Sequence, residues 1–329
     1  MNVCIVGAGA IGGFLGARLA RAGAKVSVLA RGPTATALRA HGIRLQAGGE
    51  TIAVPVVVVD DPSVVPPQDF VVVAVKGPAL ASVALQVGAL VHPDTAVVTA
   101  MNGVPWWFFR GLPGPYQDLP LRTIDRDGAI ARAIPMHSII GAVVHLTCST
   151  SEPGLVRHGV GNRLIVGEPK GGSSARLLAL AGLLREAAFD VEVSPRIQSD
   201  IWYKLWGNMT MNPISAFTGA TVDRILDDPF VNRFCFEVMA EAAAIGAAIG
   251  CPIAQSGEDR IAVTRKLGAF KTSMLQDVDA GKPVEIDLLL SAVREIGERA
   301  GVATPQLDTL LGLARLHART HGLYPEASA

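Results

Sequence analysis

The glycine-rich turn near the beginning of the chain constrains the fold more than any other feature. Gly7-Ala8-Gly9-Ala10-Ile11-Gly12 follows an apolar run at residues 3–6 and precedes helical spacing at residues 11–21. At a strand-to-helix turn, the first glycine permits a tight turn, the second lets a pyrophosphate approach the backbone, and the third lets the helix pack on the strand. The turn therefore predicts a dinucleotide-binding unit; the alternative is a glycine-rich surface turn.

The first 195 residues alternate between short β-branched runs and helical segments. This alternation is typical of a parallel sheet covered by helices, so we expect a doubly wound α/β domain of the Rossmann type at residues 1–195. The predicted strands are residues 3–6, 25–29, 70–75 and 96–100, the predicted helices are residues 11–21 and 79–90, and residues 43–45 pair with residues 52–59 as a hairpin over the turn at residues 47–49.

Strand-like runs end after residue 195, and amphipathic helical stretches follow one another. We predict an all-α domain at residues 196–323 and a short unstructured tail at residues 324–329. The predicted helices are residues 201–211, 230–249, 259–274, 286–300 and 304–319.

Composition and charge exclude several classes of function. The 329 residues include 29 basic and 29 acidic side chains, and no basic run forms a stripe for nucleic acid. The longest apolar stretches are interrupted by charges such as Glu237 and Glu241 before they reach a membrane-spanning length. The N-terminus has no basic segment typical of a signal peptide, so we expect a cytoplasmic protein without membrane or nucleic-acid partners.

No metal site is expected. The four cysteines form no Cys-x-x-Cys pair and fit buried free thiols in a reducing compartment. His317 and His321 have the i, i+4 spacing of metal ligands but lack the glutamate of the zinc-protease motif. We interpret them as the cationic end of a helix.

The end of the second predicted strand indicates which dinucleotide is bound. NAD-specific proteins place an acidic residue there to bond the ribose 2′-hydroxyl, whereas this chain has Arg31. A guanidinium can hold a 2′-phosphate through two parallel hydrogen bonds, which favours NADPH. Lys76 and Asn102-Gly103 follow two further strands, at the edge where open parallel sheets bind ligands. Each is also an ordinary strand-end or turn residue.

Polar residues recur on one face of the helix predicted at residues 201–211. Lys204, Asn208 and Asn212 are four residues apart, so at about 100° per residue they share a face among bulky apolar neighbours. Such a face either meets water or lines a cleft, and the two asparagines favour the cleft because asparagine is a poor helix former. Pro213 disfavours helical geometry at Asn212.

A second polar cluster lies at residues 271–277 and 281–287. We expect one helix to end near the first group and the next to begin at Pro283, which places Glu285 in its first turn. By these residues alone, Glu285 complements the helix dipole and Ser273 bonds to local backbone.

Together these features resemble the ketopantoate reductase (2-dehydropantoate 2-reductase) family over nearly the whole chain. The resemblance rests on the order and separation of the matching residues rather than on any one of them. They are Gly7 to Gly12, Arg31, Lys76, Asn102-Gly103, Arg157-His158-Gly159-Val160-Gly161, Lys204, Asn208, Asn212, residues 272–277 and Glu285-Ile286-Asp287.

The resemblance implies an all-helical domain like those of 6-phosphogluconate and hydroxyacid dehydrogenases, with the active site in an interdomain cleft. It implies NADPH-dependent reduction of a small 2-oxo acid, 2-dehydropantoate to pantoate in pantothenate biosynthesis, by a protein that forms a homodimer. The implied roles are Lys204 as general acid, Glu285 with Asn208, Asn212 and Ser273 at the substrate, Asn102 between substrate and cofactor, and Lys76 near the nicotinamide.

The sequence departs from the family pattern after the strand at residues 96–100. Met101 stands where glutamine is common, and an aromatic segment, Trp106 to Phe109, opens a long loop to Pro135. The loop could be a lid, a dimer surface, packing, or an apolar pocket for a larger acceptor. Two alternatives therefore stay open: a related hydroxyacid or amine-forming dehydrogenase, and a non-catalytic NADP(H)-binding sensor. Lys204 and Glu285 disfavour the sensor, which needs no acid.

Overall fold

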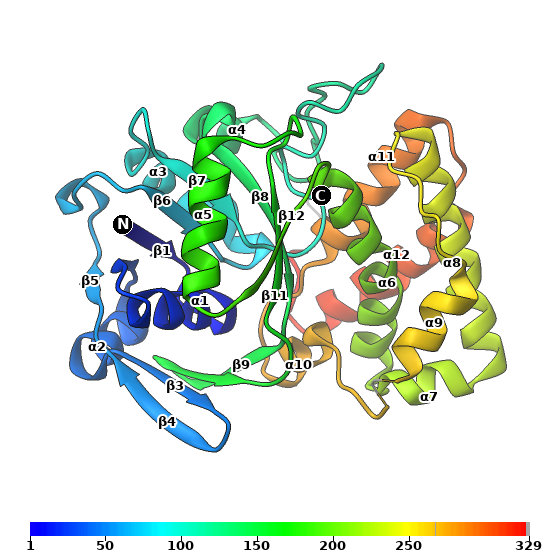
Figure 1. The fold of residues 1–329 in the computed structure, drawn as a ribbon. Coiled ribbons are helices and arrows are strands. Elements are labelled where there is room, and N and C mark those ends of the chain that lie inside the picture. The colour runs from blue at the N-terminus through cyan, green and yellow to red at the C-terminus, as the bar shows by residue number, and fades with distance from the viewer. Residues whose placement is uncertain (267, 327–329) are drawn as a thin grey trace. The chain divides into compact units, whose positions relative to one another are not determined.

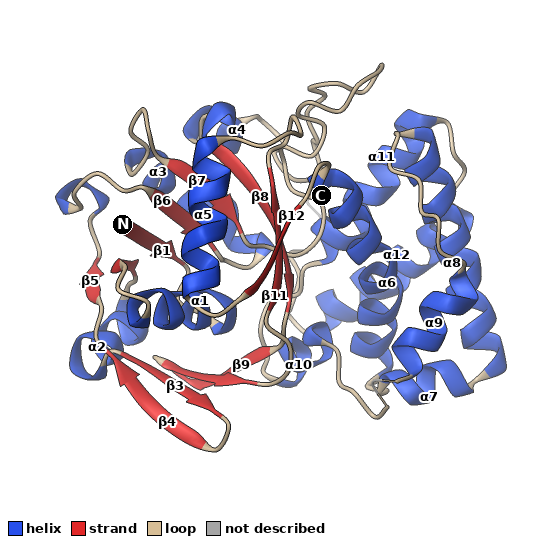
Figure 2. Ribbon diagram, viewed as in Figure 1, coloured by secondary structure: helices blue, strands red, loops and turns tan. Residues whose placement is uncertain are grey.

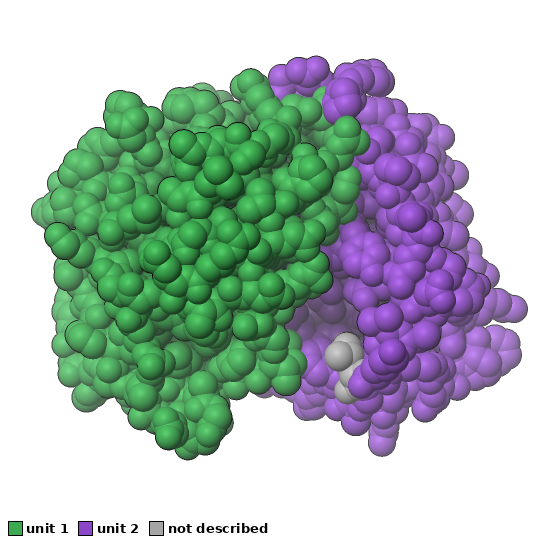
Figure 3. All heavy atoms as spheres, viewed as in Figure 1, with its two compact units in different colours: residues 1–102, 106–112, 127–200 green, residues 103–105, 113–126, 201–329 purple. Residues whose placement is uncertain are grey.

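The chain folds into two compact units, which are described separately below. The structure is a computed structural model that describes residues 1–266 and 268–326 (Figure 1). Unit 1 comprises Met1–Asn102, Trp106–Leu112 and Asp127–Asp200, and unit 2 comprises Gly103–Pro105, Pro113–Arg126 and the chain from Ile201 onward (Figure 3).

Unit 1 contains an eight-stranded sheet in the order β12-β11-β8-β7-β6-β1-β2-β5 (Figure 2). Every neighbouring pair is parallel except β8 and β11. β-branched residues fill the central strands, which are buried on both faces, as expected where helices cover a parallel sheet. The strands are β1 (Asn2–Val6), β2 (Lys25–Leu29), β5 (Val57–Val59), β6 (Phe70–Val73), β7 (Ala96–Thr99), β8 (Ile139–His145), β11 (Arg163–Gly167) and β12 (Asp190–Val193).

The helices of unit 1 pack apolar side chains against this sheet. Leu15 and Leu19 of α1 join Leu180 and Leu184 of α5 and the strand residue Val72 in one buried cluster. The doubly wound α/β class predicted for this part of the chain is confirmed. The helices are α1 (Ala10–Arg21), α2 (Gly32–His41), α3 (Leu80–Ala89), α4 (Ala129–Ala133) and α5 (Ala175–Glu186), with 3₁₀ turns η1 (Pro62–Val64), η2 (Gly77–Ala79) and η3 (Met136–Ser138).

A second, four-stranded sheet has the order β4-β3-β10-β9. Its strands are β3 (Ile43–Ala47), β4 (Glu50–Val54), β9 (Cys148–Glu152) and β10 (Leu155–His158). The hairpin predicted over residues 47–49 is present, but its second strand ends at Val54. The expectation that it continues to Val59 was wrong, because Pro55 cannot donate to the ladder and residues Val57–Val59 instead pair with β2.

Unit 2 is built from helices, which confirms the fold class predicted for the second half. They are α6 (Ile197–Thr218), whose first turn belongs to unit 1, α7 (Val222–Asp227), α8 (Pro229–Ala248), α9 (Gly257–Arg265), α10 (Ser273–Asp279), α11 (Ala292–Ala300) and α12 (Pro305–Thr320), with a π-helical turn, η4 (Asp287–Ser291), before α11. No helix in the described residues combines the length and the apolar character that a bilayer crossing needs.

Three helix boundaries in unit 2 correct the sequence prediction. The single helix expected at residues 259–274 is two helices, because the Thr272 side chain accepts a hydrogen bond from the Leu275 N–H and so begins α10 rather than ending α9. Helix α6 continues through Pro213, held by buried side chains on either side. The next helix begins at Ile286, as the predicted range 286–300 has it, and not at Pro283, so Glu285 directly precedes the helix.

The aromatic segment Trp106 to Phe109 is part of the core. All four rings are buried, and Trp107 is only 1% exposed. The Trp107 indole N–H donates to Thr99 Oγ1 at 3.2 Å, and its ring lies so close to Gly141 that a Cβ there would be 2.5 Å away. Of the roles left open for this segment, the structure shows packing within unit 1.

We expect Trp107→Ala to reduce the free energy of unfolding by about 3–5 kcal/mol, because it leaves a large cavity and removes the partner of Thr99. Urea titration followed by circular dichroism measures the change. Phe230→Ala is the control, because Phe230 is an exposed aromatic on α8. A variant of unchanged stability that loses activity only toward bulky 2-oxo acids would contradict the packing role.

Candidate active-site residues

The glycine turn has the geometry expected of a phosphate-binding turn. Gly7 has a φ of +97°, and a Cβ on it would lie 2.9 Å from the Ala74 carbonyl oxygen. A Cβ on Gly12 would overlap the Gly7 carbonyl oxygen. Neither position therefore accepts a side chain, and each glycine is required by the close approach of β1, α1 and β6.

Gly9 differs from its two neighbours in the turn. It is the N-cap of α1 with a φ of −76°, and no described atom lies within 4 Å of a Cβ built on it. The first turn of α1 contains no acidic side chain. This open position at a helix N-terminus, with its backbone N–H groups and positive dipole end, fits the pyrophosphate of a dinucleotide.

The other predicted cofactor residues lie at the same edge of the eight-stranded sheet. Arg31 follows β2 as the exposed N-cap of α2, Lys76 follows β6, and Asn102 follows β7. Because β2, β1, β6 and β7 are adjacent and parallel, these strand ends lie on one side of unit 1 together with Gly7. Strand β1 is where the strand order changes direction, which is the position at which open α/β sheets bind ligands.

The stretch Arg157 to Gly161 supports the turn by packing. The His158 ring stacks on Phe14 of α1 with centroids 4.6 Å apart, and its Nε2 lies 2.7 Å from the Gly161 carbonyl oxygen. The side chain of Val156 fills the space beside Gly13. This stretch therefore holds α1 in place and leaves the N-terminal end of that helix, at Gly9, open.

In unit 2, tryptophans fix the rotation of α6. The indole N–H of Trp202 donates to the Ala242 carbonyl at 3.1 Å, and that of Trp206 donates to the Met239 carbonyl at 2.8 Å. Both partners are on α8, and both indoles are buried. These bonds bury one side of α6, while Lys204 and Asn208 on a neighbouring side keep partial exposure.

Lys204 lies in a strongly perturbed electrostatic environment. Burial lowers the pKa of its ammonium group to about 8, and the Glu285 carboxylate opposes this effect by favouring the charged form. Glu285 is 6% exposed, between the buried residues Val284 and Ile286. The fold thus brings an amine and a carboxylate that are 81 positions apart into electrostatic contact. An amine with a pKa near neutrality is suited to proton transfer.

The remaining predicted substrate residues differ in their environment. Asn208 is partly exposed, as is Lys204, whereas Asn212 is buried. Ser273 is an exposed residue at the first position of α10, and the hydroxyl that caps this helix is that of Thr272. His317 and His321 stack with ring centroids 4.1 Å apart at the end of α12, where burial and then His321 lower the pKa of His317.

The sequence analysis did not single out Arg260, a residue of α9. Its side chain packs on α6 against Tyr203 and Gly207, which lie on either side of Lys204 in the sequence. Its guanidinium lies 5.5 Å from the centroid of the Tyr203 ring, and a Cβ on Gly207 would be 2.6 Å from Arg260 Nη2. The one available signal was Gly207, because a glycine in a helix interior that is otherwise rich in bulky residues indicates a close approach.

Comparisons with known proteins identify the family of the chain. The family described as Ketopantoate reductase PanE/ApbA matches residues 3–171, and its C-terminal part, Ketopantoate reductase PanE/ApbA C terminal, matches residues 196–318. The chain belongs to the ketopantoate reductase family. Its members use a nicotinamide cofactor, so the chain is an oxidoreductase of that kind.

Individual relatives cover the whole chain. A 2-dehydropantoate 2-reductase from Mesorhizobium japonicum is 41% identical over 98% of this chain and 100% of its own length. A crystal structure of a protein named for the same family, from Ralstonia solanacearum MolK2, is 60% identical with a TM-score of 0.95, covering 98% of this chain and 99% of that one. D-mandelate dehydrogenase, solved with NADH and anilino(oxo)acetate, shares the fold (TM-score 0.83) at 21% identity, covering 98% of this chain and 100% of that one.

Proposed function

We propose that the chain reduces a small 2-oxo acid with NADPH, and that its substrate is 2-dehydropantoate, which it converts to pantoate for pantothenate biosynthesis. The observation that carries this proposal is the pair Lys204 and Glu285, in a chain that also has an open dinucleotide turn at Gly9. The name of the relative from Mesorhizobium japonicum supports the choice of substrate.

The chemistry divides between the two groups of residues. When bound, the nicotinamide supplies a hydride to the carbonyl carbon, and the carbonyl oxygen gains negative charge. The Lys204 ammonium stabilises this oxygen and donates its proton, which completes the alcohol. The Glu285 carboxylate accepts a hydrogen bond from the substrate's own hydroxyl and so fixes its orientation.

The other site residues have binding roles in this proposal. Asn208, Asn212 and Ser273 contribute to the substrate site, Asn102 contacts both substrate and cofactor, and Lys76 is close to the nicotinamide. The turn Gly7 to Gly12 holds the pyrophosphate, and Arg31 holds the 2′-phosphate. We also propose that the protein works in the cytoplasm as a homodimer. Its free cysteines, of which Cys4, Cys235 and Cys251 are buried, support a reducing compartment.

We expect Arg31→Ala to raise the KM for NADPH about 10-fold or more, which corresponds to about 1.4 kcal/mol of lost charge-assisted bonding, and to leave NADH use nearly unchanged. Initial rates with each cofactor measure the effect. Arg39→Ala is the control, because Arg39 is an exposed arginine near the other end of α2. Equal losses with both cofactors would show that Arg31 does not recognise the 2′-phosphate.

We expect the enzyme to prefer 2-dehydropantoate over 2-oxoisovalerate, which lacks the hydroxyl. A buried carboxylate that loses its hydroxyl partner discriminates strongly, so Glu285→Ala should remove most of the preference by impairing the better substrate more. The measurement is kcat/KM for both acids, from NADPH absorbance.

The same assay with a wider panel of 2-oxo acids separates the alternatives. Turnover of another acid alone would indicate a related dehydrogenase. NADPH binding without any turnover would indicate a sensor. Because Trp106 to Phe109 are buried, they give no support to an apolar pocket for a larger acceptor.

A further inference from the structure

Helix α12 has an exposed face that carries a glycine for which the described residues of unit 2 give no packing reason. Gly312 lies at the middle of this helix, and no described atom comes within 4 Å of a Cβ built on it. A glycine in a helix interior costs about 1 kcal/mol relative to alanine. The glycines inside α1 and α6, such as Gly12 and Gly207, meet neighbouring atoms that exclude a side chain, whereas Gly312 meets none among the described residues.

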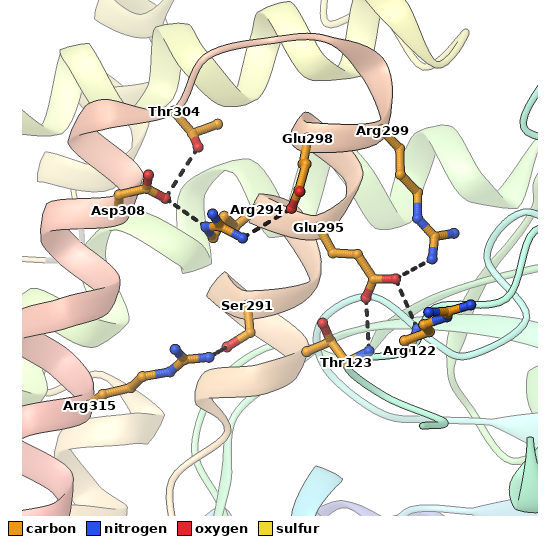
Figure 4. A network of polar contacts seen from close by, with 10 residues as sticks. All are labelled: Arg122, Thr123, Ser291, Arg294, Glu295, Glu298, Arg299, Thr304, Asp308 and Arg315. Atoms are coloured by element: carbon orange, nitrogen blue, oxygen red, sulfur yellow. Dashed lines mark hydrogen bonds and ion pairs between the residues drawn. The ribbon is translucent and has the colours of Figure 1, made fainter. Parts of the chain in front are cut away.

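Two large apolar side chains flank this glycine on the exposed surface. Leu313 is 48% exposed and Leu316 is 62% exposed. On the other side of Gly312, Asp308 and Arg315 border a groove of about 1200 Å³ between α12, α11 and residues 115–123. Figure 4 shows that Asp308 forms an ion pair with Arg294 of α11 and that Arg315 donates a hydrogen bond to Ser291 of η4, the turn before α11.

Two opposite charges on this face, Asp308 and Arg315, are self-complementary about Gly312. Asp308 lies four residues before the glycine and Arg315 three residues after it. If two copies of α12 cross antiparallel at Gly312, residue 312 + n of one copy lies opposite residue 312 − n of the other. Asp308 of each copy then lies one position from Arg315 of its partner, and the exposed leucines of the two copies meet on the opposite side of the contact.

We propose that this face of α12 binds a second copy of the chain across a twofold axis at Gly312. The absence of a side chain lets the two helix backbones approach closely, two Asp308–Arg315 ion pairs form on one side, and Leu313 and Leu316 pack against their counterparts on the other. A twofold interface uses the same patch on both copies, which this pattern satisfies. The proposal specifies the surface of the homodimer proposed above.

A comparison with helix α5 shows that the placement of charges, and not the exposed glycine alone, sets the α12 face apart. It also has an interior glycine, Gly182, without described atoms within 4 Å of its Cβ position, and one exposed leucine, Leu178. Its charged residues are Arg176, which precedes the glycine and pairs with Glu168, and Arg185 and Glu186, which both follow it. An antiparallel crossing at Gly182 would therefore place them opposite uncharged residues, and α5 offers no paired charges for a second copy.

The first test replaces the glycine. Sedimentation velocity of the full chain should give twice the 34.3 kDa chain mass for the wild type and the single mass for Gly312→Gln. Glutamine is a better helix former than glycine, so the variant's monomer should unfold at an unchanged or higher temperature. Gly182→Gln on α5 is the matched control and should remain dimeric. A monomeric wild type, a dimeric Gly312→Gln, or a monomeric Gly182→Gln would overturn the proposal.

The second test exchanges charges. Asp308→Arg and Arg315→Asp should each reduce dimerisation at least 10-fold, because like charges then face one another. An equimolar mixture should restore the dimer, because each variant supplies the charges that the other needs. A mixture that stays monomeric, with both variants folded by circular dichroism, would contradict the antiparallel pairing. NADPH oxidation assays on the same samples test the proposed activity independently, so a dimer without turnover or an active monomer shows which of the two proposals has failed.

Discussion

Replacing Lys204 by alanine is expected to lower kcat about 100-fold or more while leaving NADPH affinity near that of the wild type. The variant lacks the ammonium group that stabilises the developing alkoxide and donates its proton, an effect in the range usual for general acid catalysis. Stopped-flow measurement of a single turnover separates the chemical step from product release. Lys271→Ala is a suitable control, because Lys271 is an exposed lysine of unit 2 paired with Asp279. A near-normal kcat for Lys204→Ala would remove Lys204 from the mechanism.

The pH profile provides a second readout of the same residue. Because the pKa of Lys204 is lowered to about 8, the protonated acid is present below that pH and is lost above it. Reduction should therefore be nearly constant from about pH 6 to 7 and should fall as the pH rises through 8. In Glu285→Gln the carboxylate that favours the charged amine is absent, so the fall should move to lower pH. A profile that does not move would show that the two groups are not coupled in the working enzyme.

Replacing Gly12 by alanine is expected to eliminate NADPH binding and to destabilise unit 1. The added methyl group would overlap the carbonyl oxygen of Gly7, so α1 must shift away from β1. Core overpacking typically costs about 1–3 kcal/mol, and a backbone collision belongs at the upper end. Isothermal titration with NADPH and thermal unfolding measure the two consequences.

Gly9→Ala is the matched variant, because its methyl group enters open space and its φ suits alanine. It should fold normally and yet bind NADPH at least about 10-fold more weakly, since the methyl group occupies the approach of the pyrophosphate. If Gly9→Ala binds NADPH normally, the phosphates do not pass over this residue. If Gly12→Ala is as stable as the wild type, the close packing of α1 on β1 does not hold in solution.

Local signals were sufficient for the elements buried on both faces. Strand β2 coincides with the predicted residues 25–29, because β-branched runs bounded by polar or glycine residues have few other conformations that bury them. The glycine turn was equally predictable, since three glycines in that spacing satisfy several geometric demands at once.

Helix boundaries and long-range contacts could not be obtained in the same way. Thr272 is compatible with a helix interior and with an N-cap, and only the fold selects the cap. Pro213 disfavours a helix locally, but the buried residues around it keep α6 continuous. The proximity of Lys204 to Glu285 depends on how α6 and the segment before α11 pack, which is not encoded in either segment alone.

The π-helical turn at Asp287–Ser291 contains one more residue than an α-helix would need. Its Leu288 carbonyl accepts the N–H of Val104, and a Cβ on Gly103 would lie 2.5 Å from the same oxygen. Deleting a single leucine here would restore regular winding and rotate Glu285 by about 100° about the axis of α11. The direction of the Glu285 carboxylate therefore depends on the number of residues in this turn. Deleting one residue here would impair the site more than a conservative substitution of any of its leucines.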